Sequence, residues 1–162
     1  SSIQGVKYGI FVQVTNGIRS SSYLIDIADW QNETIHIECK RFFRSETRAE
    51  VDFNHILDSL YHQVIPGLVQ RLAEDIISGK TLSIGSCRLT KQGMYITTGT
   101  LLWKKETLVP FSNLKFNAYS GQISVSSVRD TKINTSMSIR DTWNAALLEF
   151  IVKAVVGMKT NR

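Results

Sequence analysis

Apolar and polar residues alternate over the first forty residues of the chain, with the two-residue period of half-buried β-strands. In the first run, the alternate apolar positions are Tyr8, Ile10, Val12 and Val14. The pattern predicts strands over residues 6–15, 20–27 and 34–43. Asn16-Gly17, between the first two runs, is a dipeptide that favours a tight hairpin turn. We therefore expect three antiparallel strands at the start of the chain.

The hydrophobic period then changes to that of one helical face over residues 51–78. The apolar positions are Phe53, Ile56, Leu57, Leu60, Val64, Leu68, Val69, Leu72 and Ile76. Pro66 lies inside this run, where a proline removes a backbone hydrogen bond and clashes with the preceding turn. A kink or two abutting helices are therefore expected, with Gly79 at the C-terminal end.

The second half of the chain returns to short alternating runs separated by turn residues. The predicted strands are residues 82–89, 94–98, 101–105 with a short continuation over 107–109, 114–119, 122–128 and 134–139. Lys91-Gln92-Gly93, Thr98-Gly99-Thr100 and Ser120-Gly121 are the expected turns. A last helix is predicted over residues 141–156, with Asp141 as its N-cap. Its apolar side is formed by Trp143, Ala146, Leu147, Phe150, Ile151 and Ala154.

Several small motifs of this second half carry a family resemblance. They are Gly79-Lys80, Ile84-Gly85-Ser86, Leu89 with Gly93-Met94, the Val109-Pro110-Phe111 and Ser112-Asn113-Leu114 steps, the hairpin of residues 119–125, and Asn144. On these motifs, residues 79–156 resemble the pleckstrin-homology-like C-terminal domain of a family of uncharacterised bacterial proteins. The chain departs from the family at Phe111, commonly tryptophan there, and at Trp143, where a proline often precedes the asparagine. The resemblance implies a pleckstrin-homology-like fold and frequent membrane association.

Together, these patterns predict an α+β protein rich in antiparallel strands. We expect a pleckstrin-homology-like barrel or sandwich capped by a C-terminal helix over residues 81–162. A three-stranded sheet and a long helix precede it over residues 1–80, as a partial pleckstrin-homology-like β-β-β-α segment. The two halves share an architecture, and no residue-level repeat relates them.

Charge is distributed unevenly along the 162 residues, whose net charge is +5. Residues 1–80 hold 8 Lys and Arg against 10 Asp and Glu, whereas residues 81–162 hold 11 against 4. The basic half suits an anionic lipid surface, an acidic protein surface or the acidic first half, and a merely solvated basic surface is the simpler alternative. Nucleic acid is not expected, because the basic residues are scattered and no nucleic-acid-binding motif accompanies them.

Phosphoinositide-binding domains of this class clamp phosphates with basic residues on their first two strands. Arg88, Lys91, Lys104 and Lys105 occupy the comparable region and are the candidate anion- or lipid-binding residues. The run of residues 94–98 has no basic residue, so diffuse attraction to an anionic surface is favoured over recognition of one head group. A second basic cluster, Lys40, Arg41, Arg44 and Arg48, is interleaved with glutamates and predicts a salt-bridged connection.

Catalytic and metal-binding motifs are not recognised in the sequence. His55 and His62 lie seven residues apart on the predicted helix without a second ligand pair, and His36 is alone on a strand. Cys39 and Cys87 lack metal-type spacing and are expected to be reduced, small apolar residues. We expect no cofactor, no metal and no enzymatic activity.

The sequence thus predicts a non-enzymatic pleckstrin-homology-like module that docks to a protein partner or to an anionic membrane surface. Such a module would be cytoplasmic or peripheral to the cytoplasmic membrane. The chain opens without a methionine, and we expect it to be a piece of a longer protein. One alternative is a self-associating structural domain whose incomplete first half pairs its open sheet edge with a second copy. A hydrolase whose site is not visible in sequence is the alternative from another class.

Overall fold

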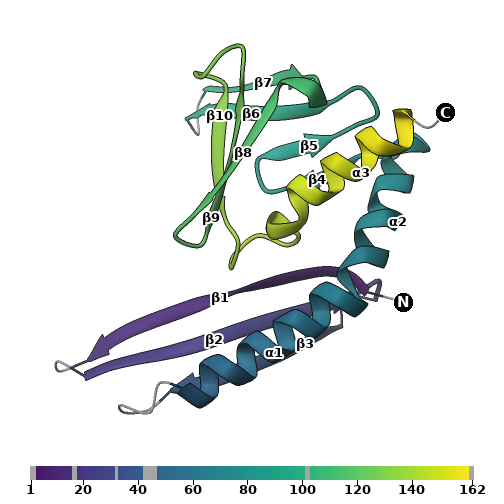
Figure 1. Cartoon of the computed structure of the whole chain (residues 1–162). Helices are drawn as coiled ribbons and strands as arrows, with labels where there is room; N and C mark the ends of the chain where they lie inside the picture. Colours follow the sequence, from purple (N-terminus) through teal and green to yellow (C-terminus); the bar gives the residue numbers. More distant parts are fainter. Residues whose placement is uncertain (1–2, 16–17, 32, 42–46, 101–102, 161–162) are drawn as a thin grey trace. The chain divides into compact units, whose positions relative to one another are not determined.

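The chain folds into two compact units, Ser1–Leu68 and Val69–Arg162, in a computed structural model. The structure describes residues 3–15, 18–31, 33–41, 47–100 and 103–160. It contains antiparallel sheets and a C-terminal helix, which confirms the predicted α+β class (Figure 1). The units are described one at a time below.

The first unit opens with the predicted three-stranded antiparallel sheet, in the order β1-β2-β3. Its strands are β1 (Ile3–Thr15), β2 (Ile18–Asp29) and β3 (Thr34–Arg41). The register aligns Tyr8 with Ile25 and Ile25 with Ile37, so the alternate apolar residues of all three strands share one face. Phe42 and Phe43, within the third predicted run, lie outside the described residues.

Helix α1 (Thr47–Gln63) packs on this apolar face. The Tyr23 and Phe53 rings lie 5.3 Å apart between centroids, and the Tyr8 and Tyr61 hydroxyls are hydrogen-bonded at 2.6 Å. Ile25, at the centre of the sheet, is fully buried. The helical spacing of Phe53 and Leu60 therefore meets the two-residue spacing of the strands in one small core.

The long predicted helix is two abutting helices, α1 and α2 (Ile65–Ile77), as expected from Pro66. Proline is tolerated in the first turn of α2, because a backbone N–H at that position would have no acceptor within the helix. At the other end, Gly79 has φ +101°, its N–H binds the Ile76 carbonyl, and the Lys80 N–H binds the Asp75 carbonyl. This pair of bonds is a Schellman cap, so the predicted glycine stop is confirmed.

The second unit begins with a four-stranded sheet, β4-β5-β6-β7. The run of residues 82–89, predicted as one strand, is instead a hairpin of β4 (Leu82–Ile84) and β5 (Cys87–Leu89). The turn lies at Gly85, whose φ of +55° reverses the chain. The alternation of apolar residues continues through the turn, which is why the pattern alone indicated one strand.

The next strand also differs from the prediction. β6 (Met94–Thr100) continues through Gly99, where a turn was expected, whereas β7 (Trp103–Val109) runs on to Val109 as the predicted continuation did. Gly99 has φ +102°, and a Cβ there would collide with the Trp103 carbonyl oxygen. The glycine therefore serves close strand approach inside the hairpin. Residues 101–102 lie outside the described chain.

A second, three-stranded sheet follows in the order β10-β9-β8. It comprises β8 (Leu114–Tyr119), β9 (Gln122–Ser127) and β10 (Asn134–Ser138). The predicted Ser120-Gly121 hairpin is confirmed, with positive φ at both residues. A hydrogen bond of 2.6 Å joins the Ser86 hydroxyl, in the β4–β5 turn, to Thr135 of β10. The described strands form two separate sheets and not a closed barrel.

The C-terminal helix α3 (Leu148–Thr160) starts later than predicted. Asn144 adopts a left-handed conformation, which interrupts a right-handed helix, and a short 3₁₀ turn at Ala145–Leu147 leads into α3. Asp141 is therefore not the N-cap. The buried face is Leu148, Ile151, Val152 and Val155, whereas the side chain of Phe150, predicted on the apolar side, is exposed. Near the end of α3, the Lys159 ammonium lies 5.1 Å from the Phe111 ring centroid.

Candidate functional site

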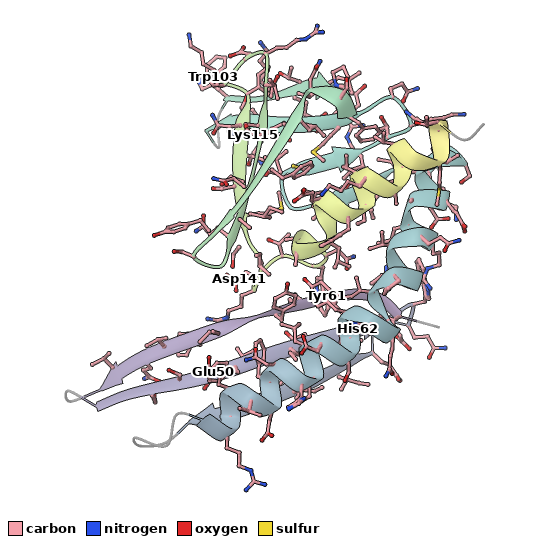
Figure 2. The ribbon with its side chains drawn as sticks, viewed as in Figure 1. Glu50, Tyr61, His62, Trp103, Lys115 and Asp141 are labelled. Carbon is pink, nitrogen blue, oxygen red and sulfur yellow. The ribbon has the colours of Figure 1, made fainter. Side chains whose placement is uncertain are left out.

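The most exposed aromatic side chain of the second unit lies at the end of the β6–β7 hairpin where the chain passes from β6 to β7. Trp103 is 83% exposed and starts β7, opposite Thr100 of β6. Lys104 and Lys105 follow it on the same strand, and both are exposed. Figure 2 shows Trp103 at the outer end of this hairpin. We name Trp103, Lys104 and Lys105 the hairpin tip.

Local geometry explains why these three side chains are all exposed. Successive strand residues point to opposite sheet faces, so Lys104 and Lys105 leave the hairpin on its two sides. Their partners across the ladder are Gly99 and Thr98, which are too small to cover them. Farther along β7, Val109 is buried opposite Met94, so the hairpin is rooted in the core while its tip stands clear.

The electrostatics of the tip are those of uncompensated positive charge. Among the residues the structure describes, neither Lys104 nor Lys105 has an ion-pair partner. Two other exposed lysines of the unit are neutralised locally: Lys80 pairs with Asp75 and Lys153 with Glu149, each at 2.7 Å. Among the described residues, the exposed Lys91, Lys115 and Lys132 also have no ion-pair partner, but none of them adjoins an exposed tryptophan. Two free ammonium groups beside an exposed indole are therefore available to an external ligand.

Arg88 lies on β5, and its guanidinium is already engaged in contacts within the protein. Its guanidinium is 2.6 Å from the Glu106 carboxylate and 4.1 Å from the Tyr95 ring centroid. Arg88 faces Tyr95 directly across the β5–β6 ladder, so these contacts extend over the outer face of the sheet. An anion at Arg88 would have to compete with Glu106, which is part of the fold itself.

Lys91 lies in the β5–β6 turn, at the other end of β6 from the hairpin tip. The four steps from Met94 to Thr98, which faces Lys105, span about 13 Å of strand. The Lys91 carbonyl accepts a hydrogen bond from the Lys159 ammonium. The structure thus brings together Lys104 and Lys105 and separates Lys91 from them. The anion-binding role of the four residues stays a prediction.

Sequence reasoning singled out the two lysines of the tip but not Trp103. The sequence did contain a signal that could have identified Trp103: a tryptophan directly followed by two lysines, close to an expected turn. An indole is large and apolar with one polar N–H, a combination enriched where an apolar phase meets water. Trp103 therefore changes a diffuse basic patch into a site with a defined centre.

The histidines of the first unit take part in structural contacts. His36 Nδ1 contacts the Asp26 carboxylate, which also lies 3.4 Å from the Lys7 ammonium, in a row across all three strands. On α1, His62 Nδ1 is 2.7 Å from the Asp58 carbonyl oxygen. Across the part of the chain that the structure describes, no group of three His, Cys, Asp or Glu side chains is placed to hold a metal ion.

Both cysteines are free thiols, and they differ in environment. Cys87 is buried in the core of the second unit, and desolvation raises the pKa of its thiol to about 12. Cys39 on β3 is half-buried, and its pKa is raised by desolvation and then by the negative charge of Asp52. A thiol with a raised pKa is a poor nucleophile at neutral pH.

Comparison of the chain with protein-family models, curated proteins and solved structures gave no match. Within the described ranges, the helices are all too short or too polar to span a bilayer. The site is therefore interpreted from its own geometry and charge.

Proposed function

We propose that this protein is a non-enzymatic interaction module whose second unit, a pleckstrin-homology-like domain, docks on an anionic membrane surface. The hairpin tip is the contact: Trp103 enters the interfacial layer while Lys104 and Lys105 approach the anionic head groups. The exposure of Trp103 beside two unpaired lysines is the observation that carries this proposal. The proposal implies a location peripheral to a membrane.

The architecture of the second unit supports the pleckstrin-homology-like assignment. Four consecutive antiparallel strands are followed by three more and then by a C-terminal helix. This order of elements is the one implied by the family that residues 79–156 resemble. The resemblance also implies frequent membrane association, in agreement with the character of the tip.

The expected strength of this contact is modest. A basic residue near an anionic membrane contributes about 1 kcal/mol, so the two lysines supply about 2 kcal/mol. Partial burial of the indole adds an amount on the order of 2 kcal/mol. Because each 1.4 kcal/mol is a factor of ten, the tip raises partitioning onto the membrane by roughly a thousandfold. Both the charged and the apolar component are needed for this total.

Liposome co-sedimentation tests the proposal. We expect binding to vesicles of phosphatidylcholine mixed with phosphatidylserine and little binding to phosphatidylcholine alone. Lys104→Ala with Lys105→Ala removes about 2 kcal/mol and should weaken binding about 30-fold. Trp103→Ala should weaken it by about the same factor and abolish any vesicle-induced blue shift of tryptophan fluorescence.

Matched controls are available in the same unit. Lys80→Ala with Lys153→Ala removes the same charge from lysines already paired with carboxylates. Tyr119→Ala removes an aromatic side chain that is 81% exposed, on the hairpin of the other sheet and without a neighbouring lysine. Equal binding to neutral vesicles, no binding at all, or equal losses in control and tip variants would refute the proposal. The case of no binding points to an acidic protein surface as the partner.

A further inference from the structure

The first unit exposes an apolar strip along its edge strand β1. Ile10, Val12 and Val14 are 54%, 43% and 66% exposed, although they share the sheet face on which α1 packs. The residues beside them on β2 are covered: Tyr23, opposite Ile10, and Ser21, opposite Val12, are both buried. The strip therefore begins where the cover of α1 ends.

The width of a helix accounts for this boundary. A helix is about 10–12 Å across, which covers roughly two strands at about 4.8 Å spacing. α1 lies over β2 and β3, which both contact it, and the Tyr23–Phe53 contact and the full burial of Ile25 agree with this. The far end of β1 also extends past β3, because Val14 pairs with Arg19 of β2 and β3 ends opposite Ser21. Figure 1 shows this end reaching beyond the first turn of α1.

The two edge strands of this sheet differ in how they discourage pairing with another strand. β3 carries His36, Glu38 and Lys40 on alternate positions, and charged side chains are a usual protection of sheet edges. Between Tyr8 and Val14, β1 has no charged residue and no proline. The part of this edge strand from Tyr8 to Val14 lacks these devices and is suited to strand addition.

We infer that β1 is a self-association strand, pairing antiparallel with β1 of a second copy of the chain. Every even position from Val6 to Val14 is apolar, so any two-fold pairing centred between Ile10 and Val12 places apolar residues opposite apolar residues. Such a pairing places Lys7 far from its symmetry mate, and no like charges face each other. The result is a continuous six-stranded sheet.

A second copy also covers the strip, which a single added peptide strand would not. In the paired sheet, each α1 lies over β2 and β3 of its own copy, so the two helices are about four strand spacings apart, or about 19 Å. Each helix is about 10–12 Å wide, so a valley of about 8 Å remains between them. Ile10, Val12 and Val14 of both copies fill that valley. Because the β3 edges are charged, growth stops at the dimer.

Sedimentation velocity of the full chain over a range of concentrations, without lipid, tests this inference. The wild-type chain should show a reversible monomer–dimer equilibrium. Ile10→Lys and Val14→Lys should each raise the dissociation constant by about tenfold or more, because two-fold symmetry places two lysines in one interface. Hydrogen exchange at residues 10–14 should slow as the wild-type concentration rises.

Ile35→Lys is the matched control. The Ile35 side chain is 63% exposed, a fraction similar to the 66% of Val14, and it shares the α1 face of the sheet. It lies, however, on the charged edge strand β3. This variant should dimerise as the wild type does. The inference is overturned if the wild-type chain stays monomeric at high concentration, if either β1 variant dimerises normally, or if Ile35→Lys weakens the dimer equally. Because no lipid is present, the outcome is independent of the membrane-docking proposal.

Discussion

At the scale of single residues, the surroundings of a side chain decide the chemistry that its type permits. Cys39 and Cys87 both occupy strands in alternating runs, and both were expected to be reduced apolar residues. The structure confirms two free thiols but places only Cys87 in a core. Burial raises the pKa of Cys87 to about 12, which removes the reactive thiolate at neutral pH.

We therefore predict unequal labelling of the two thiols in the native protein. At pH 8, a water-soluble thiol reagent should modify Cys39 within the experiment and Cys87 only after unfolding, since the core must open first. Mass spectrometry of the labelled peptides measures both sites. Simultaneous modification of both cysteines in the folded chain would contradict the burial of Cys87.

The Tyr8–Tyr61 hydrogen bond gives a second residue-scale prediction. Burial, and then the bond to Tyr61, raises the pKa of Tyr8 above its usual value of 10. A raised pKa means that the neutral form stabilises the fold below about pH 10, and that this stabilisation is lost as the pH rises further. Tyr8→Phe should cost about 1 kcal/mol of unfolding free energy near neutral pH.

Urea unfolding followed by circular dichroism, at neutral pH and above about pH 10, measures this effect. The difference between the wild type and Tyr8→Phe should shrink at the higher pH, because ionisation of Tyr8 opposes folding only in the wild type. Ser59→Ala serves as the control, because it removes an exposed hydroxyl from α1, the helix that carries Tyr61. An undiminished difference at high pH would show that the hydroxyl pair does not hold Tyr8 neutral.

At the scale of elements, turn residues decide where a run of alternating apolar residues is divided. Ser120-Gly121 forms a two-residue loop between β8 and β9, with φ of +49° and +75°. Positive φ at both central positions defines a type I′ turn, for which Asn-Gly is the preferred sequence. Gly85 performs the corresponding reversal between β4 and β5.

Substitutions in the β8–β9 turn should therefore either raise or lower the stability of the second unit. Ser120→Asn should stabilise the second unit by a few tenths of a kcal/mol, since asparagine tolerates the left-handed region better than serine. Gly121→Val should destabilise it by about 1–2 kcal/mol, because a β-branched residue is strained there. Space is not the cause, since a Cβ at Gly121 would meet no atom within 4 Å. Thermal unfolding measures both shifts, and a stabilising Gly121→Val would contradict the turn type.

At the scale of the whole molecule, opposite charge is divided between the two units. The unit Ser1–Leu68 holds 6 Lys and Arg against 8 Asp and Glu, whereas Val69–Arg162 holds 13 against 6. The charge difference that was counted about residue 80 in the sequence thus persists when the chain is divided between Leu68 and Val69. In the proposed membrane docking, long-range attraction to the anionic surface comes from the second unit, and salt should screen it.

Salt should separate the two components of the proposed membrane contact. Raising the salt concentration from about 0.1 M to 1 M shortens the screening length from about 10 Å to 3 Å. Wild-type and Trp103→Ala binding to anionic vesicles should both fall steeply, because their lysines remain. The residual binding of the Lys104→Ala, Lys105→Ala variant should fall less. A salt response that is the same in all three proteins would mean that the tip lysines do not face the lipid.

Local rules account for the parts of the fold that were predicted correctly. Alternation in residues 6–15, the Pro66 break and the Gly79 cap each act within a few residues, so they are readable in sequence. The errors at residues 82–89, at Gly99 and at Asp141 have another origin. At Gly99 the reason is a close approach between strands, because only a glycine leaves room for the Trp103 carbonyl oxygen. Before α3 the reason is the left-handed backbone of Asn144, which interrupts the helix that was expected to begin at Asp141.

The sequence by itself determined the class of elements, the charge difference between the halves and the identity of the two tip lysines. It did so because hydrophobic period, backbone restriction and formal charge are properties of residues and their near neighbours. Only the tertiary structure decided which side chains are free. Arg88 forms an ion pair with Glu106, and the Trp103 side chain is exposed. Helix α1 leaves the apolar strip of β1 uncovered. Exposure and pairing depend on residues distant in sequence, which the packing within each unit brings together or leaves apart.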